Sequence, residues 1–232
     1  MTMALGNTQA IIEKSRMNVA EESQISERAY NLIIGAMLLW GFFLNYVTVA
    51  AFGQQVMAMV AGMNPAVFLI VYFVLVIVGN IMVVKGGAAL SFVGYTLIAA
   101  PIGVVVCMSV QGIPVSIVKS AVLVTAIVTL LFMIAGTLFP GFFLRLGRVL
   151  FFSLLFTIVG SLINLLLFGA RNSMLYQWIG TATFSLYIGY DWARANTCAR
   201  TVDNAIDLSA SLYLDIINLF LRILRIMSRN RK

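Results

Sequence analysis

Residues 115–138 read VSIVKSAVLVTAIVTLLFMIAGTL, and this stretch decides the class of fold. Lys119 is its one charged residue. The stretch is slightly longer than the ~20 residues that an α-helix needs to cross the hydrocarbon core of a bilayer. Its apolar residues follow one another without the alternation that marks a strand of a transmembrane barrel. The stretch therefore predicts a transmembrane α-helix.

The same pattern recurs on both sides of this stretch, with Gly, Pro and polar residues between the runs. We predict seven transmembrane helices in an all-α, polytopic membrane protein. A polar N-terminal tail over 1–30 precedes a seven-helix transmembrane domain over 31–227, and a basic C-terminal tail follows over 228–232. Pro101, inside the third helix, is expected to kink it. The predicted helices are 32–52, 66–84, 88–110, 115–138, 148–169, 173–195 and 206–227.

The composition excludes several functions. Hydrophobic residues make up 62% of the chain and charged residues 10%, whereas soluble domains have about 45–50% and about 25%. Too few charges remain to solvate the surface of a soluble globule of this size. The chain has no His, and Cys107 and Cys198 are isolated from each other, so His-based catalysis and His- or Cys-ligated metal sites are not indicated. We expect neither an enzyme nor a bound cofactor.

Basic residues are unevenly distributed between the two predicted ends of the bundle. Of the ten basic residues that precede Arg222, eight lie on the side of the N-terminus, which predicts a cytoplasmic N-terminus. Seven spans then place the C-terminus outside, whereas the five basic residues near it favour the cytoplasm. The eight are Lys14, Arg16, Arg28, Lys85, Arg145, Arg148, Arg194 and Arg200; the opposite two are Lys119 and Arg171; the last five are Arg222, Arg225, Arg229, Arg231 and Lys232.

Two aspartates lie within otherwise apolar predicted helices. Asp191 occurs in TATFSLYIGYDWARA and Asp215 in SASLYLDIINLFLRILRI. A charged side chain at membrane depth costs about 2.5–3.5 kcal/mol on insertion scales, and by default it suggests function. If one helix runs to about Arg200 and the next begins near Ala205, each aspartate lies about nine or ten residues from the turn, at equal depth. Spacing alone does not show whether the two side chains face each other.

Facing carboxylates in a low dielectric cannot both ionise cheaply, so such a pair tends to share one proton. After losing that proton, the pair offers the hard oxygen ligands that Ca²⁺ prefers. The sequence therefore predicts a pH sensor and a calcium site at Asp191 and Asp215. The alternative is that each aspartate separately bonds a neighbouring helix.

Three polar residues are candidates to support the pair. Ser211 and Asn218 lie four residues before and three after Asp215, so they share its helix face. Tyr187 lies four residues before Asp191. These side chains can orient the carboxylates or supply ligand oxygens, or they can instead hydrogen-bond between helices.

Three other charged residues near the two aspartates are explained by helix structure and not by function. Arg194, three residues after Asp191, can pair with that aspartate, but an interfacial cation at the helix end is the favoured interpretation. Asp203 and Asp207 are expected at the start of the last helix, where an acidic side chain satisfies free N–H groups and the helix dipole.

The C-terminal third resembles the Bax inhibitor family, also called the transmembrane Bax inhibitor motif proteins, and within it the bacterial members. The resemblance rests on FSLYIGYDWARA (184–195), LSASLYLDIINLFLRILRI (208–226) and FLRLGRVLFFSLLFTIVGSLINLLLF (143–168), and more weakly on KGGAALSFVGYTLIAAPIGV (85–104). The combination of the tyrosine–aspartate motif with the leucine–tyrosine–leucine–aspartate motif is specific.

The resemblance implies a seven-helix fold with the last helix at the centre and a pH-sensitive calcium leak. In bacterial members, the aspartates that match Asp191 and Asp215 form a hydrogen-bonded pair whose protonation state governs opening. A basic residue near the end of the second helix latches the closed state. Lys85 lies in that region, where the family has several arginines, and an ammonium cannot make the bidentate contact of a guanidinium. The other interpretation of Lys85 is a charge that reaches the membrane interface.

We therefore predict a pH-sensitive calcium leak channel gated by an intramembrane aspartate pair. The expected partners are calcium, protons and, at the basic C-terminal tail, anionic lipid headgroups, but not nucleic acid. The alternatives are a regulatory membrane protein that binds a membrane protease or a cell-death factor, and a cation/proton exchanger. Short loops and no recognisable organellar targeting segment favour a multi-pass protein of a bacterial inner (plasma) membrane.

Overall fold

The computed structural model describes residues 24–168 and 174–229, and within them the chain is helical and contains no strand. Most of the predicted tails, over 1–23 and 230–232, lie outside the described residues, as does Arg171. The helices are α2 (Glu27–Ala50), α3 (Gly53–Ala61), α4 (Pro65–Lys85), α5 (Ala88–Val110), α6 (Val115–Leu138), α7 (Pro140–Arg145), α8 (Gly147–Phe168), α9 (Met174–Thr197) and α10 (Val202–Arg229).

Local sequence signals set most of the helix boundaries. The predicted runs 88–110 and 115–138 coincide with α5 and α6. Ser26 caps α2, since its hydroxyl accepts a hydrogen bond from the Ala29 amide at 3.2 Å, so this helix begins earlier than its apolar run. The short helices α3 and α7 were not predicted, because neither is long enough to form a run of its own.

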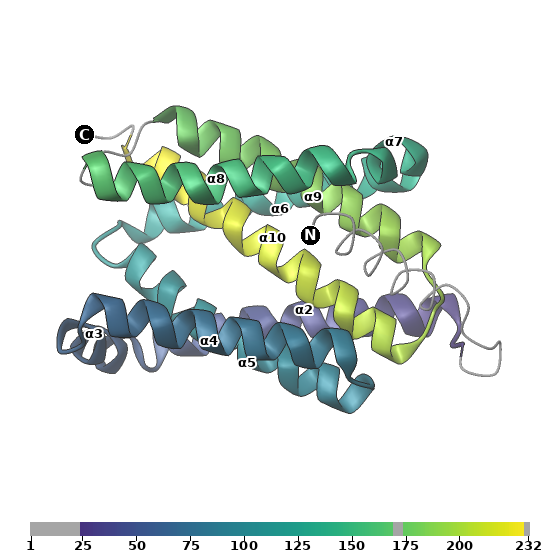
Figure 1. Cartoon of the computed structure of the whole chain (residues 1–232), viewed down its shortest axis with the longest axis horizontal. Helices are drawn as coiled ribbons and strands as arrows, with labels where there is room; N and C mark the ends of the chain where they lie inside the picture. Colours follow the sequence, from purple (N-terminus) through teal and green to yellow (C-terminus); the bar gives the residue numbers. More distant parts are fainter. Residues whose placement is uncertain (1–23, 169–173, 230–232) are drawn as a thin grey trace, which may run out of the picture.

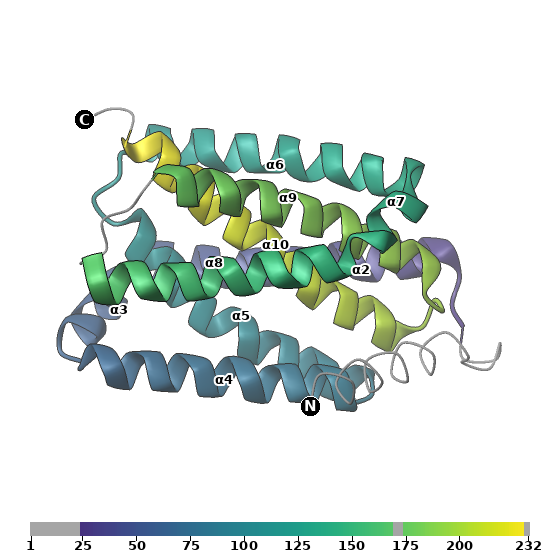
Figure 2. The same cartoon turned by 45° about the horizontal axis from the view of Figure 1, so that its top comes forward.

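The long helices form two groups with α10 between them (Figure 1). In the first group α5 packs against α2 and α4, and in the second α9 packs against α6 and α8. α10 contacts α9 and α6 on one side and α2 and α5 on the other, whereas direct contacts between the two groups are sparse in the described residues. Figure 2 shows the same oblique course of α10 through the molecule. The implied central position of the last helix is confirmed.

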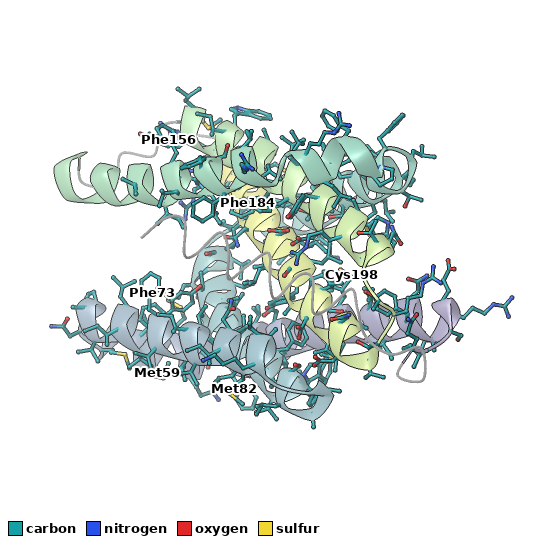
Figure 3. All side chains as sticks on the ribbon, turned by 45° about the vertical axis from the view of Figure 1, so that its right-hand side comes forward. Met59, Phe73, Met82, Phe156, Phe184 and Cys198 are labelled. Atoms are coloured by element: carbon teal, nitrogen blue, oxygen red, sulfur yellow. The ribbon has the colours of Figure 1, made fainter. Side chains whose placement is uncertain are left out.

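Polarity explains which helices lie outside. α4 exposes large apolar side chains such as Ile70, Phe73 and Ile77, while α10 has buried residues in every turn from Asn204 to Ile226. Figure 3 labels exposed side chains on the outer helices, among them Phe73, and the inward-facing Phe184 on α9. Because lipid solvates apolar side chains and penalises polar ones, the more polar helices α9 and α10 pack inside.

Four helices, α2, α4, α5 and α6, are long and apolar enough to cross a membrane by length and composition. With the family assignment given below, this makes a multi-pass membrane protein. The number of seven crossings remains a prediction, because α9 and α10 do not meet that apolar criterion in the part of the chain that the structure describes. α9 and α10 fall short of the criterion because they contain polar residues, among them the candidate site residues.

One end of the bundle is joined by polar contacts between segments far apart in the sequence. The Ile25 amide donates a hydrogen bond to the Arg200 carbonyl at 2.7 Å, and the Arg200 guanidinium lies 3.1 Å from the Glu27 carboxylate. The Ser91 hydroxyl donates to Asp203 at 2.7 Å. The starts of α2, α5 and α10 therefore meet at this end, and α10 finishes at the opposite one (Figure 1).

Candidate functional site

Asp191 on α9 and Asp215 on α10 lie within hydrogen-bonding contact of each other. Both residues are buried, with 5% and 7% of their surface exposed. The two aspartates lie where α10, which has more buried residues than the other described helices, packs against α9, its most extensive neighbour. Of the two sequence interpretations, the facing pair matches this geometry, and separate bonding to other helices does not.

The two aspartates meet for a reason different from the one that their spacing suggested. α9 ends at Thr197 and α10 begins at Val202, so the expected helix ends near Arg200 and Ala205 are wrong. At 1.5 Å per residue, Asp191 lies about 9 Å from the end of α9 and Asp215 about 20 Å from the start of α10. The carboxyls still meet, so an equal number of residues from the turn is not what brings them together.

The contact of the carboxyls depends on a proton. Oδ2 of Asp215 is buried and accepts no hydrogen bond from an N–H or hydroxyl group of the described residues. Two carboxylates in contact repel each other, and a buried acceptor without a donor is costly. A proton held between Asp191 and Asp215 removes both costs.

Arg194 supplies the positive charge of the site, contrary to the expectation that it is an interfacial cation. Its Nη1 lies 3.3 Å from Oδ1 of Asp191, and its side chain is only 22% exposed. Its guanidinium carbon lies 5.7 Å from the centroid of the Tyr190 ring, in cation–π geometry. One turn of α9 therefore holds an aspartate, its counter-ion and an aromatic ring against that counter-ion.

The three predicted supporting residues differ in their relation to the pair. Tyr187 lies within electrostatic range of both carboxyls. Asn218 instead donates its side-chain amide to the Leu214 carbonyl of its own helix at 2.8 Å. Ser211 is partly buried on α10 and has no side-chain hydrogen bond among the described residues. Of the three, Tyr187 is the one that the structure brings to both aspartates.

Lys85 lies apart from the pair in this conformation. It is the last residue of α4, is exposed, and has no ion pair with either aspartate in the described part of the chain. This position agrees with the interfacial interpretation of Lys85. The latch hypothesis stays a prediction about other conformations of the protein.

The two acids near the start of α10 have different surroundings. The cap of this helix is Thr201, whose hydroxyl accepts from the Asn204 amide at 3.1 Å. Asp203 lies in the first turn, where its charge suits the dipole, and its carboxylate binds Ser91 on α5. Asp207 lies in the second turn and is 3% exposed, so its interpretation as a helix-start acid was wrong.

Arg222, which the sequence groups with the basic residues near the C-terminus that favour the cytoplasm, has a partner inside the bundle. The residue is partly buried: its guanidinium donates to the Gln177 side chain at 3.4 Å, and a Cβ on Gly180 would lie 2.8 Å from its Nε. Gln177 is itself only 3% exposed. A glutamine and a glycine three residues apart in α9 were the available signal.

The described residues contain no group of three or more His, Cys, Asp or Glu side chains placed to hold a metal ion. A calcium ion at the pair would therefore have two carboxylates and would need neutral oxygens or water for the rest of its six to eight ligands.

A family model described as "Inhibitor of apoptosis-promoting Bax1" matches residues 22–232. The chain belongs to this family, the Bax inhibitor family. The resemblance inferred from the motifs around Asp191 and Asp215 is confirmed.

Two relatives show how far the likeness to individual members of the Bax inhibitor family extends. An uncharacterised protein of Helicobacter pylori (strain ATCC 700392 / 26695) is 39% identical over 83 residues, 36% of this chain and 35% of that protein. A "BI1-like protein" of Arabidopsis thaliana is 42% identical over 84 residues, 35% of this chain and 32% of that protein. The matched segments span about a third of each relative's length.

Proposed function

We propose that this member of the Bax inhibitor family is a pH-sensitive calcium leak channel gated by Asp191 and Asp215. The observation that supports the proposal is the contact of two buried carboxyls between α9 and the central helix α10. The chain crosses the membrane seven times, with its N-terminus in the cytoplasm of a bacterial cell, and it has no enzymatic activity.

The protonated pair holds the closed state. A shared proton lets the carboxyls hydrogen-bond and keeps α9 against α10. Loss of the proton leaves two like charges, which repel by about 4 kcal/mol at 4 Å with an effective dielectric near 20. A change of that size shifts a two-state helix packing whose states differ by a few kcal/mol.

The architecture supports opening at α10. This helix makes the extensive contacts between the two helix groups, so a shift of α9 relative to α10 loosens the main junction within the bundle. A path that opens there passes the two carboxylates. Calcium then neutralises the repulsion that proton loss created, and it competes with protons for the same oxygens.

A regulatory role is the second candidate. The description of the matching family names an inhibitor of an apoptosis-promoting protein, and the Arabidopsis relative is named BI1-like. In this role the protein binds a partner membrane protein, such as a protease or a cell-death factor. The interaction is then expected to survive the loss of both aspartates.

Calcium flux into liposomes that contain the purified protein tests the proposal. Flux should rise with pH between about pH 5 and 8, the range that burial permits for carboxyl titration. Asp215→Asn should remove most of this dependence without unfolding the bundle, because an amide and an acid have nearly the same volume. Asp203→Asn is the matched control on the same helix, since its partner is Ser91.

Flux that does not change over this pH range would remove the channel proposal and place the regulatory role first. Saturable flux coupled to proton movement in the opposite direction would instead indicate an exchanger. Flux that changes equally with pH in the wild type and in Asp215→Asn would assign the sensor to other residues.

A further inference from the structure

One face of α10 is only partly covered by the other helices. Between Asn204 and Ile226 most residues of this helix are buried, and the six that are not follow one another at intervals of three or four residues, with one adjacent pair. Residues at these intervals share one face of a helix. The six form what is called here the open stripe: Ser211, Leu214, Asn218, Leu221, Arg222 and Arg225.

The neighbours of α10 explain why this face stays open. α9 borders it, because the Arg222 guanidinium donates to Gln177 at 3.4 Å and lies against Gly180. α4 contacts α10 only sparsely, and α8 packs against α9 rather than against α10. In Figure 1, α10 is visible between α8 above it and α4 below it. In a membrane, the open stripe therefore faces lipid.

The open stripe is too polar to face bare hydrocarbon. The Ser211 hydroxyl makes no hydrogen bond among the described residues, and the Asn218 side-chain oxygen accepts none, since only the amide nitrogen of Asn218 is used. Arg222 lies five residues before the end of the predicted helix at 227, or about 7 Å at 1.5 Å per residue. Polar and charged groups in hydrocarbon are costly. The stripe therefore favours an occupant that brings its own polar atoms to this end.

The charges of the stripe specify the polar end of the occupant. Arg222 and Arg225 lie one turn apart and within electrostatic range of each other. Neither forms an ion pair with an acidic side chain in the part of the chain that the structure describes. Two neighbouring cations repel each other, and a phosphate group removes this repulsion because it accepts hydrogen bonds from guanidinium groups. This end of the stripe therefore suits a phosphate.

The rest of the stripe suits the less polar parts of a phospholipid. Inward from the arginines, Asn218 comes first and Leu214 follows. An amide can hydrogen-bond an ester carbonyl of the glycerol region, and a leucine packs against an acyl chain. From Arg225 to Leu214 the helix rises about 16 Å, close to half of the ~30 Å hydrocarbon core. The stripe thus has the length of one leaflet.

We propose that the open stripe of α10 binds an anionic phospholipid, with its phosphate on Arg222 and Arg225 and an acyl chain along Leu221 and Leu214. This is one defined site on the side of the bundle, and it differs from a general attraction of headgroups to the basic tail over 228–232. The site lies at the end of α10 away from the turn that follows α9, and it does not depend on the proposed function.

Native mass spectrometry of the purified, delipidated chain measures binding of the first lipid. Dioleoyl phosphatidylglycerol should bind at one saturable site, at least about fivefold more tightly than dioleoyl phosphatidylcholine, which has the same acyl chains. Arg222→Gln and Arg225→Gln should each weaken phosphatidylglycerol binding about fivefold, the equivalent of about 1 kcal/mol per basic residue. Arg148→Gln is the matched control, because Arg148 is an exposed arginine of α8 without an ion pair among the described residues, and this variant should bind like the wild type.

Two further measurements test the acyl chain and the seat on α9. Glycerol phosphate, which is a headgroup without chains, should not displace phosphatidylglycerol at equal concentration. Gly180→Ala keeps both arginines, but its Cβ would lie 2.8 Å from Nε of Arg222, so the guanidinium must move and phosphatidylglycerol binding should weaken. If Arg222→Gln does not fold, Arg225→Gln still tests the proposal, since Arg225 is exposed.

Equal affinity for the two lipids would overturn the proposal, as would equal weakening in Arg148→Gln and Arg225→Gln. Displacement by glycerol phosphate at equal concentration would show a plain anion site and exclude the acyl chain. A dimer that binds no phosphatidylglycerol would place a second copy of the chain on the stripe instead. None of these measurements involves calcium flux, so the lipid site and the channel proposal stand or fall separately.

Discussion

Gly136 of α6 lies directly against the backbone of Gly189 in α9, so close that a Cβ on Gly136 would stand 2.5 Å from the Gly189 carbonyl oxygen. Gly189 precedes Asp191 by two residues. On its other side, a Cβ on Gly189 would overlap the Phe143 ring of α7. The segment of α9 that carries Asp191 is therefore packed tightly between neighbouring helices, and small residues permit the close approach.

This tight packing predicts the effect of one methyl group. Gly136→Ala should destabilise the protein by about 1–3 kcal/mol, because the added carbon meets backbone that cannot rotate away. Thermal unfolding in detergent measures the change. Gly35→Ala on α2 is the control, since its Cβ would meet no atom within 4 Å and Ala is the better helix former. Equal melting temperatures for the two variants would show that α6 and α9 are not in this close contact.

A buried hydrogen bond joins α10 to the other helix group. The Tyr213 hydroxyl donates to the Asn45 side chain on α2 at 2.9 Å, and the rings of Tyr213 and Tyr95 pack edge to face at 5.5 Å. Tyr213→Phe keeps the ring and leaves a buried acceptor unpaired, so it should cost about 1 kcal/mol. Tyr46→Phe is the control, because that residue is 69% exposed. A loss of stability equal in both variants would contradict the assignment.

The sequence predicted the long helices because apolar runs and helix-breaking residues are local signals. α5 and α6 match their predicted bounds for that reason. The two deep aspartates were also found locally, from charge in an apolar setting. Their contact was not derivable from spacing, because it depends on how α9 and α10 are rotated and shifted against each other.

The surroundings of the site were harder to predict, since they depend on helix rotation. Arg194 and Arg222 resemble interfacial cations in the sequence, yet both turn inward toward partners on or along α9. Asp207 resembles a helix-start acid, but the helix begins early enough to bury it. In each case the charge of the residue could be read from the sequence, but the direction in which its side chain points is set by how the helices pack.

Lys85 provides a test of the latch implied by the family. It is exposed at the end of α4 and has no ion pair with Asp191 or Asp215 in the described residues. Lys85→Ala should therefore leave calcium leak unchanged at low pH, when the pair is protonated. A leak that rises at low pH in this variant would show that Lys85 holds the closed state.

Topology can be tested at the two ends of the bundle. Cys198 is 8% exposed and poorly accessible to reagents, so both native cysteines are first replaced by Ala. Asn196→Cys, at the end of α9, should react from the cytoplasm, because most basic residues lie at that end. Ser116→Cys, at the start of α6, should react from outside. Both positions are exposed.

Labelling of both positions from one side would contradict the predicted crossings, because α6, α8 and α9 separate them in the chain. Labelling with the two sides exchanged would keep the number of crossings and reverse the orientation.

Calcium and protons should compete at the aspartate pair. Under the proposed function calcium binds the two ionised carboxylates and not the protonated pair, so raising the calcium concentration favours proton loss. The midpoint of the carboxyl titration, followed by infrared spectroscopy, should therefore move to lower pH as calcium rises. Asp191→Asn or Asp215→Asn should abolish the shift, since either change removes one of the two charged ligands, whereas Asp203→Asn should retain it. A midpoint independent of calcium would mean that proton loss opens the helices without a cation between the carboxylates, and separation of α9 from α10 would then be the sole relief of their repulsion.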